Sequence, residues 1–218
     1  MIDSFDRWEA AGFKLVRARD NKLMVAKHKS AKGFLFKKYN NNIHPARQLT
    51  KYERRVTGAH TIKALIEMHG LRRVVVPKKW LVRLPDMFSS GTDAGYIVIV
   101  EEMPIVETDK SKKLYRRIDK RTLRELCLIF YMCKELDFRA QNMPFTKRGK
   151  IAFVDTGYLA LRNIQQREDE ATYFHLVEKY LSDKRIRLAN EIWHELRSSP
   201  PKQPHPSSIE NPVAPLSG

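Results

Sequence analysis

The sequence predicts an α+β fold, in which a strand-rich first part is followed by a mainly helical second part. Up to about residue 102, short apolar runs rich in Val, Leu and Phe alternate with polar or glycine-containing breaks, as in an antiparallel sheet. From residue 122 onward, the apolar residues recur with helical spacing. Six of the 11 prolines lie in residues 198–218, which have no hydrophobic periodicity, so this tail is predicted to be disordered.

The first part is expected to contain one long helix among its strands. Residues 44–69 hold strong helix formers, with Pro45 near the start and Gly70 as the C-cap. A cluster of Ser, Gly, Thr and Asp at 89–93 indicates a turn before the last strand. The expected strands are residues 13–19, 22–27, 33–39, 74–76, 81–84 and 96–100.

The second part is expected to begin with a buried helix. Residues 122–136 are apolar on all sides, which is typical of a helix inside a core. A loop at 137–142 follows, and the turn Lys147-Arg148-Gly149 separates two short strands. The remaining expected elements are strands at 143–146 and 151–154 and helices at 168–181 and 186–196.

Composition limits the classes of protein that this chain can be. Its 218 residues suit one domain or two small ones, and 41 Lys and Arg against 25 Asp and Glu give a net charge of +16. Such an excess favours an anionic partner: an acidic protein, an anionic membrane surface, a polyphosphorylated ligand or nucleic acid. Zinc-finger spacings and RNA-binding aromatic motifs are missing, so sequence-specific reading of nucleic acid is not expected.

Basic residues gather in two groups along the sequence. These two groups are interpreted either as ordinary solvent-exposed surface or as the surface that contacts the anionic partner. The first group is Arg47, Lys51, Arg54, Arg55, Lys63, Arg72, Arg73, Lys78, Lys79 and Arg83. The second group is Lys110, Lys112, Lys113, Arg116, Arg117, Lys120, Arg121 and Arg124.

The sequence favours a reducing, cytoplasmic compartment. Its apolar runs are all too short to span a membrane, and the charged first ten residues do not resemble a signal peptide. The two cysteines, Cys127 and Cys133, lie in one apolar segment and are expected to be reduced thiols of the core.

One group of polar residues has the composition and spacing expected of a catalytic site. Asp137 and Asn142 follow the buried helix, and Asp155 and Gly157 follow a hydrophobic strand. A hairpin between the two stretches would bring Asp155 beside Asn142. Oxygen ligands of this kind suit Mg²⁺, and Asp137 would then be available to orient an attacking hydroxyl.

This arrangement resembles the catalytic loop and the metal-binding Asp-x-Gly of the protein-kinase-like superfamily, most of all its minimal bacterial members. Those are small effector-type kinases and the lipopolysaccharide, sugar and antibiotic phosphotransferases. The resemblance implies that Asp137 addresses the substrate hydroxyl and that Asn142 and Asp155 hold Mg²⁺. It implies ATP as the phosphate donor, and delivery to a host cytosol as an alternative to the bacterial cytoplasm.

The resemblance extends to the first part of the chain. The strand at 33–39 resembles the one that supplies a lysine to the nucleotide phosphates. Lys37 is preferred, with Leu35 on the same face against adenine, and Lys38 is the alternative. The following helix offers Glu53 as the partner of that lysine, and Glu67 lies near its far end.

The resemblance also implies a hinge at 101–103. There the main chains of Glu101 and Met103 would bind adenine, with Val100 as gatekeeper. The implied fold is two-lobed: a small antiparallel-sheet N-lobe at 1–103, a truncated helical C-lobe at 104–197 and the tail at 198–218.

The sequence departs from the family in its phosphate loop. No glycine lies between Gly12 and Gly33, so the glycine-rich loop is missing. Arg17, Arg19 or Lys22 could substitute for it by charge, or the nucleotide site could be weak or lost.

Further departures concern regulation and substrate. Glu135 and Leu136 replace the usual His-Arg before the catalytic Asp, and Thr156 replaces the usual Phe. The absence of the Ala-Pro-Glu motif and the short C-lobe imply a truncated substrate platform without a phosphorylation switch.

Two hypotheses, besides general nucleic-acid binding, follow. The first is an ATP- and Mg²⁺-dependent phosphotransferase whose acceptor is a protein hydroxyl, with a sugar or lipid hydroxyl as the alternative acceptor. The second is an inactive pseudokinase that uses its basic face to bind an acidic protein, a membrane surface or nucleic acid. An acidic activator would be compatible with either.

Overall fold

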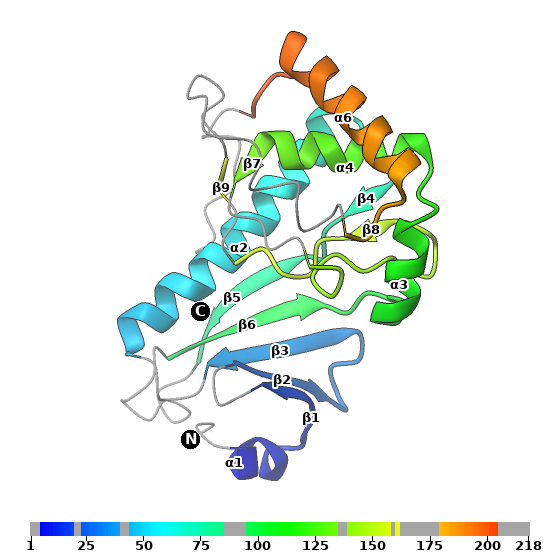
Figure 1. Ribbon diagram of the computed structural model, residues 1–218. Helices are drawn as coiled ribbons and strands as arrows, with labels where there is room; N and C mark the ends of the chain where they lie inside the picture. Colours follow the sequence, from blue (N-terminus) through cyan, green and yellow to red (C-terminus); the bar gives the residue numbers. More distant parts are fainter. Residues whose placement is uncertain are drawn as a thin grey trace. The chain divides into compact units, whose positions relative to one another are not determined.

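The computed structural model describes residues 5–19, 23–39, 44–84, 95–134, 139–157, 160–161 and 179–204 (Figure 1). The fold is α+β, as predicted. The chain divides into two compact units. Unit 1 is Met1–Thr57, Pro77–Met103 and Asn211–Gly218, and unit 2 is Gly58–Val76 and Pro104–Glu210.

The change from unit 1 to unit 2 at Met103 coincides with the hinge expected at 101–103. The segment Gly58–Val76 was expected in the first lobe, whereas it belongs to unit 2. Its apolar side chains explain this assignment, because Ile62, Leu65 and Val74 belong to the core of unit 2.

Unit 1 is built on a five-stranded antiparallel sheet with the strand order β1-β2-β3-β6-β5 (Figure 1). The first three strands form the predicted meander, and β6 pairs with the other edge of β3. The strand that carries Lys37 and Lys38 is therefore central. The strands are β1 (Phe13–Arg19), β2 (Leu23–His28), β3 (Phe34–Tyr39), β5 (Lys79–Arg83) and β6 (Tyr96–Glu101).

The two faces of this sheet have separate apolar cores because successive side chains of a strand point to opposite faces. The helix α1 (Phe5–Ala10) covers one face with a tryptophan, and α2 (Pro45–Met68) covers the other. The buried residues of the first core are Trp8, Met24, Ala26 and Ile97. Those of the second core are Tyr39, Tyr52, Val56, Val98 and Val100.

The described part of unit 2 contains the second part of α2, three further helices and a short parallel strand pair. The strand β4 pairs in parallel with β8, so that the chain after α2 runs beside the strand that leads to Asp155. The elements are β4 (Val74–Val75), α3 (Thr108–Tyr115), α4 (Lys120–Met132), β7 (Cys133–Lys134), β8 (Ile151–Ala152), β9 (Ala160–Leu161) and α6 (Asp183–Ser198).

The helix α4 is the centre of unit 2, as its all-round apolarity predicted. Nine of its 13 residues are buried, and it packs against α6 through Tyr131 and Trp193, whose ring centroids are 5.4 Å apart. The thiols of Cys127 and Cys133 are buried and unoxidised. Burial raises the pKa of the Cys127 thiol to about 12, against a smaller opposite effect of Arg124.

The strand expected at 143–146 is limited to isolated bridges at Phe145 and Thr146, and the helix α1 was not predicted. Three further differences from the sequence-based expectations have physical causes. The predicted helix at 122–136 ends at Met132, because Cys133 is extended, with φ −117° and ψ 143°, and pairs with Leu161. The helix α3 was not predicted, since Leu114 and Tyr115 are its only apolar residues. The parallel pairing of β4 with β8 was also not expected, because it joins residues far apart in the sequence.

Some expectations fall on residues outside the described ranges. These are the turn at 89–93, most of the helix at 168–181 and the tail from residue 205. Residues 179–181 form a turn and a bend. The described helices include none that is long and apolar enough to cross a membrane.

Candidate active site

The hairpin predicted between Asn142 and Asp155 is confirmed. The peptide N–H of Val154 donates to the carbonyl oxygen of Asn142 at 3.0 Å, and that of Ala152 donates to the carbonyl of Pro144 at 2.8 Å. These bonds pair the two arms of the hairpin. The residue before Asp155 is therefore bonded directly to Asn142.

The turn of this hairpin depends on a glycine. The peptide N–H of Gly149 donates to the Thr146 carbonyl at 2.9 Å, and Gly149 has a φ of +76°. Residues with a Cβ rarely adopt this conformation. The Lys-Arg-Gly turn recognised in the sequence thus closes the hairpin.

Asn142 and Asp155 lie at the open end of the hairpin. The Asn142 residue is 8% exposed and Asp155 is half-buried. The oxygen Oδ1 of Asp155 accepts the peptide N–H of Gly157 at 3.2 Å, which holds the carboxylate over its own turn. Asp137, the expected hydroxyl-orienting residue, lies outside the described residues, as do Glu135 and Leu136.

The segment Asp155-Thr156-Gly157 packs directly on α2 at Gly58. A Cβ built on Gly58 would lie 2.3 Å from the Thr156 carbonyl oxygen and 3.0 Å from the Thr156 Cβ. Real Cβ atoms essentially never approach a backbone oxygen so closely. A glycine at position 58 is therefore what lets this segment lie against the helix.

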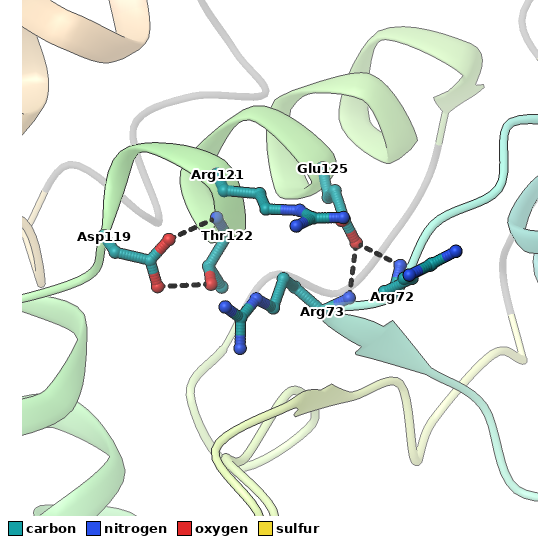
Figure 2. Close-up of polar contacts among 6 residues, drawn as sticks. All are labelled: Arg72, Arg73, Asp119, Arg121, Thr122 and Glu125. Carbon is teal, nitrogen blue, oxygen red and sulfur yellow. Dashed lines mark hydrogen bonds and ion pairs between the residues drawn. The ribbon is translucent and has the colours of Figure 1, made fainter.

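The strand that leads to Asp155 is also tied to β4. The peptide N–H groups of Ile151 and Phe153 donate to the carbonyls of Arg73 and Val75, each at 2.9 Å. Figure 2 shows how α4 holds the start of β4 in turn. The carboxylate oxygen Oε2 of Glu125 accepts the N–H of Arg72 at 2.9 Å and that of Arg73 at 2.6 Å.

The same region shows how α4 begins (Figure 2). The carboxylate of Asp119 accepts the peptide N–H of Thr122 at 3.0 Å and its hydroxyl at 2.6 Å, as an N-cap does. Partial burial alone would raise the pKa of Asp119. The hydrogen bonds from Thr122 and the charge of Arg73 outweigh it, so the pKa lies below its ordinary value of 3.8.

The first arm of the hairpin is held by α3. The hydroxyl of Tyr115 donates to the Met143 carbonyl at 2.7 Å, and the hydroxyl oxygen of Ser111 accepts the N–H of Phe145 at 3.0 Å. Burial raises the pKa of the Tyr115 phenol far above its ordinary value, so it remains a donor. This support of the hairpin was not expected from the sequence, because α3 was not predicted.

In unit 1, the two lysines of β3 point to opposite faces of the sheet. Lys37 pairs across the strands with Val98 and lies on the face that α2 covers, as does Leu35. Lys38 lies on the other face and is 0% exposed, whereas Lys37 is half-buried. The expected alternation is confirmed, and Lys37 shares its face with Val100.

Glu53 lies in the part of α2 that belongs to unit 1. It is half-buried, and within the described ranges it makes no ion pair or hydrogen bond. Its pairing with Lys37 therefore remains a prediction. The alternative, Glu67, lies in unit 2, where its carboxylate is 3.9 Å from the Lys63 amine.

The expected hinge uses two of its three peptide N–H groups for structure. The N–H of Glu101 donates to the Lys78 carbonyl at 2.9 Å, and that of Glu102 donates to the Gly33 carbonyl at 2.7 Å. The side chain of Glu102 also pairs with Lys27 at 2.5 Å. By contrast, the N–H and carbonyl of Met103 have no hydrogen-bond partner among the described residues.

Glu101 and Met103, the two residues expected to bind adenine through their main chains, differ in how many of their main-chain groups the fold already uses. The peptide N–H of Glu101 already serves the sheet. Among the described residues, Met103 has one main-chain donor and one main-chain acceptor without a partner, and its contact with adenine remains a prediction.

The donor atoms at the open end of the hairpin suit a hard divalent cation. Asn142 and Asp155 offer an amide oxygen and a carboxylate, which are ligands that Mg²⁺ accepts together with water and phosphate oxygens. The described part of the chain contains no group of three His, Cys, Asp or Glu that could hold a metal ion, so Mg²⁺ binding by Asn142 and Asp155 remains a prediction.

The candidate substitutes for a glycine-rich loop cannot be placed. The structure describes the backbone of β1 through Arg19, but the side chains of Arg17 and Arg19, and all of Lys22, lie outside the described part.

Comparison with protein-family models gives no match, and a search of the curated proteins finds no significant similarity.

Proposed function

We propose that the chain is an ATP- and Mg²⁺-dependent phosphotransferase with a protein-kinase-like two-lobed fold. The observation that carries the proposal is the hairpin bond between Val154 and Asn142, because it brings the amide and the carboxylate of Asp155 to the same end of one hairpin. In the protein-kinase template, an Asn and an Asp with this spacing hold the metal ions.

Each unit contributes its own part to this function. In unit 1, Lys37 would bind the α- and β-phosphates, with Glu53 as its partner, and the main chains of Glu101 and Met103 would bind adenine. In unit 2, Asn142 and Asp155 would hold Mg²⁺. The bound metal would neutralise charge on the phosphates.

Phosphate transfer requires little covalent chemistry from the protein. Asp137 would accept or orient the proton of the attacking hydroxyl, and the remaining residues would position the nucleotide. We propose a protein hydroxyl as the acceptor, because the sequence resembles small effector-type kinases.

The decisive test compares Asp155→Asn with Asp183→Asn. Asp183 is an exposed aspartate in the first turn of α6 and serves as a matched control. We expect Asp155→Asn to abolish phosphate transfer from labelled ATP to protein substrates or to the chain itself, with thermal unfolding near that of the wild type. Transfer that survives in Asp155→Asn at the level of Asp183→Asn would contradict the proposal.

A second candidate function is a pseudokinase that acts as a binding module. Two observations favour it: no glycine lies between Gly12 and Gly33, and the exposed side of α3 is strongly basic. A thermal-shift titration with Mg-ATP separates the two candidates. An enzyme must bind the nucleotide and be stabilised by it, whereas a module without a nucleotide site shows no shift.

A further inference from the structure

The helix α3 has two chemically different sides. Ser111 and Tyr115 are 0% and 1% exposed and face the core of unit 2. The opposite side is exposed and carries a single acid, Asp109, which pairs with Lys112 at 2.8 Å. The basic residues of this side and of the turn that follows the helix are together named the α3 basic face: Lys110, Lys112, Lys113, Arg116 and Arg117.

Within the described part of the chain, only one of these five bases forms an ion pair. Lys112 pairs with Asp109, but the others have no ion pair with any described residue. The excess of like charge on one short helix destabilises it unless counter-charges are near. The α3 basic face therefore gains most from an anionic partner.

We propose that the α3 basic face binds an extended acidic segment of a partner protein. Three of the bases lie on the two turns of α3, a length of about 12 Å, and Arg116 and Arg117 lie in the turn that directly follows the helix. A small phosphorylated ligand would meet only one or two of them. A chain of carboxylates can follow the helix and meet all of them.

The chemistry of the face argues against the other polyanions. Helices that bind at a lipid surface bury apolar side chains in it, whereas the apolar residues of α3, Leu114 and Tyr115, pack against the core. Proteins that bind single-stranded nucleic acid stack bases on aromatic rings, and the exposed side of α3 has no aromatic residue.

The buried side of the same helix links this face to the candidate active site. Ser111 and Tyr115 hold the hairpin arm that begins at Asn142, through Phe145 and Met143. A partner that neutralises the basic face would stabilise α3 and, through these bonds, the arm. Binding of the partner to the α3 basic face and stabilisation of the hairpin arm do not require phosphate transfer. Only an effect of the partner on catalysis would rest on the proposed function.

The test measures binding of a fluorescein-labelled polyglutamate peptide by anisotropy. One variant replaces the four unpaired bases of the face by glutamine: Lys110, Lys113, Arg116 and Arg117. A charge-matched control replaces four exposed bases on other elements by glutamine: Lys29, Lys32, Lys184 and Arg187. Thermal unfolding of both variants verifies that they are folded.

We expect the α3 variant to bind the peptide about tenfold more weakly than the wild type, and the control to stay within about twofold. Equal loss in both variants would show that only net charge matters and would overturn the proposal. It would also be overturned if single-stranded DNA of equal length, or phosphatidylserine-containing vesicles, bound more tightly than the peptide in an α3-dependent way.

A second measurement tests the link to the hairpin. The Phe145 amide, which donates to Ser111, should exchange with deuterium about threefold more slowly when the peptide is bound. The α3 variant should not show this slowing. Peptide binding without any change at Phe145 would overturn the link, whether or not the protein transfers phosphate.

Discussion

The carboxylate of Glu125 accepts the peptide N–H of Arg73 at 2.6 Å, and the carbonyl of Arg73 accepts the N–H of Ile151. The N–H and the carbonyl of Arg73 thus connect α4, the central helix of unit 2, to β8, the strand that leads to Asp155. The carboxylate is buried, with its side chain 9% exposed, so water contributes little to its solvation.

Replacement of Glu125 by glutamine should lower the free energy of unfolding by about 1–3 kcal/mol, because the buried acceptor of two N–H groups loses its negative charge. Urea unfolding measures this change. The matched control is Glu191→Gln, at an exposed position of α6, which should change stability by less than about 0.5 kcal/mol. Equal effects of the two substitutions would contradict the role given to Glu125.

The Asp119 cap makes part of the stability depend on pH. The folded-state pKa of Asp119 lies below its ordinary value of 3.8, so its stabilisation is fully present above that value. It is lost as the pH falls through the folded-state pKa. Asp119→Asn keeps a cap acceptor but does not titrate.

We therefore expect the stability difference between wild type and Asp119→Asn to shrink as the pH falls from neutral to below 3.8. Urea unfolding across this range measures the difference. A difference that is independent of pH would show that the charge of Asp119 contributes nothing.

The contact between Gly58 and Thr156 predicts that replacing this glycine by alanine destabilises the protein, although the same replacement normally stabilises a helix. Alanine in place of glycine in a helix normally stabilises by about 1 kcal/mol. At position 58 the new Cβ would meet the Thr156 carbonyl, so we expect Gly58→Ala to destabilise by about 1–3 kcal/mol. It should also weaken Mg-ATP binding, because the Asp155 segment must shift.

The control for this helix is Ala64→Gly, which should cost about 1 kcal/mol through helix propensity alone. Thermal unfolding with and without Mg-ATP gives both quantities. If Gly58→Ala stabilised the protein, the close approach would not exist in solution.

Because Lys37 and Lys38 point to opposite faces of the sheet, we expect their substitutions to affect different properties: nucleotide binding for Lys37 and stability without ligand for Lys38. Lys37→Met should remove most of the thermal stabilisation by Mg-ATP, since the charge on the α2-covered face is lost. Lys38→Met should change the unfolding temperature without ligand but retain the shift with Mg-ATP. The reverse result would assign the phosphate-binding role to Lys38.

Local patterns in the sequence were sufficient for much of the fold. Short apolar runs separated by polar or glycine-containing breaks predicted the meander of β1 to β3, and the long run of helix formers predicted α2 to within one residue at each end. The hairpin that brings Asn142 beside Asp155 was predicted from its turn, because the Lys147-Arg148-Gly149 sequence between two short apolar segments is a local signal.

Tertiary structure decided what depends on distant partners. The end of α4 at Met132 depends on pairing with Leu161, and the peptide groups that Glu125 binds lie 52 and 53 residues away from it in the sequence. The need for glycine at position 58 arises only from the approach of Thr156. A sequence records side-chain type and spacing, whereas close approach and burial arise when separate segments pack together.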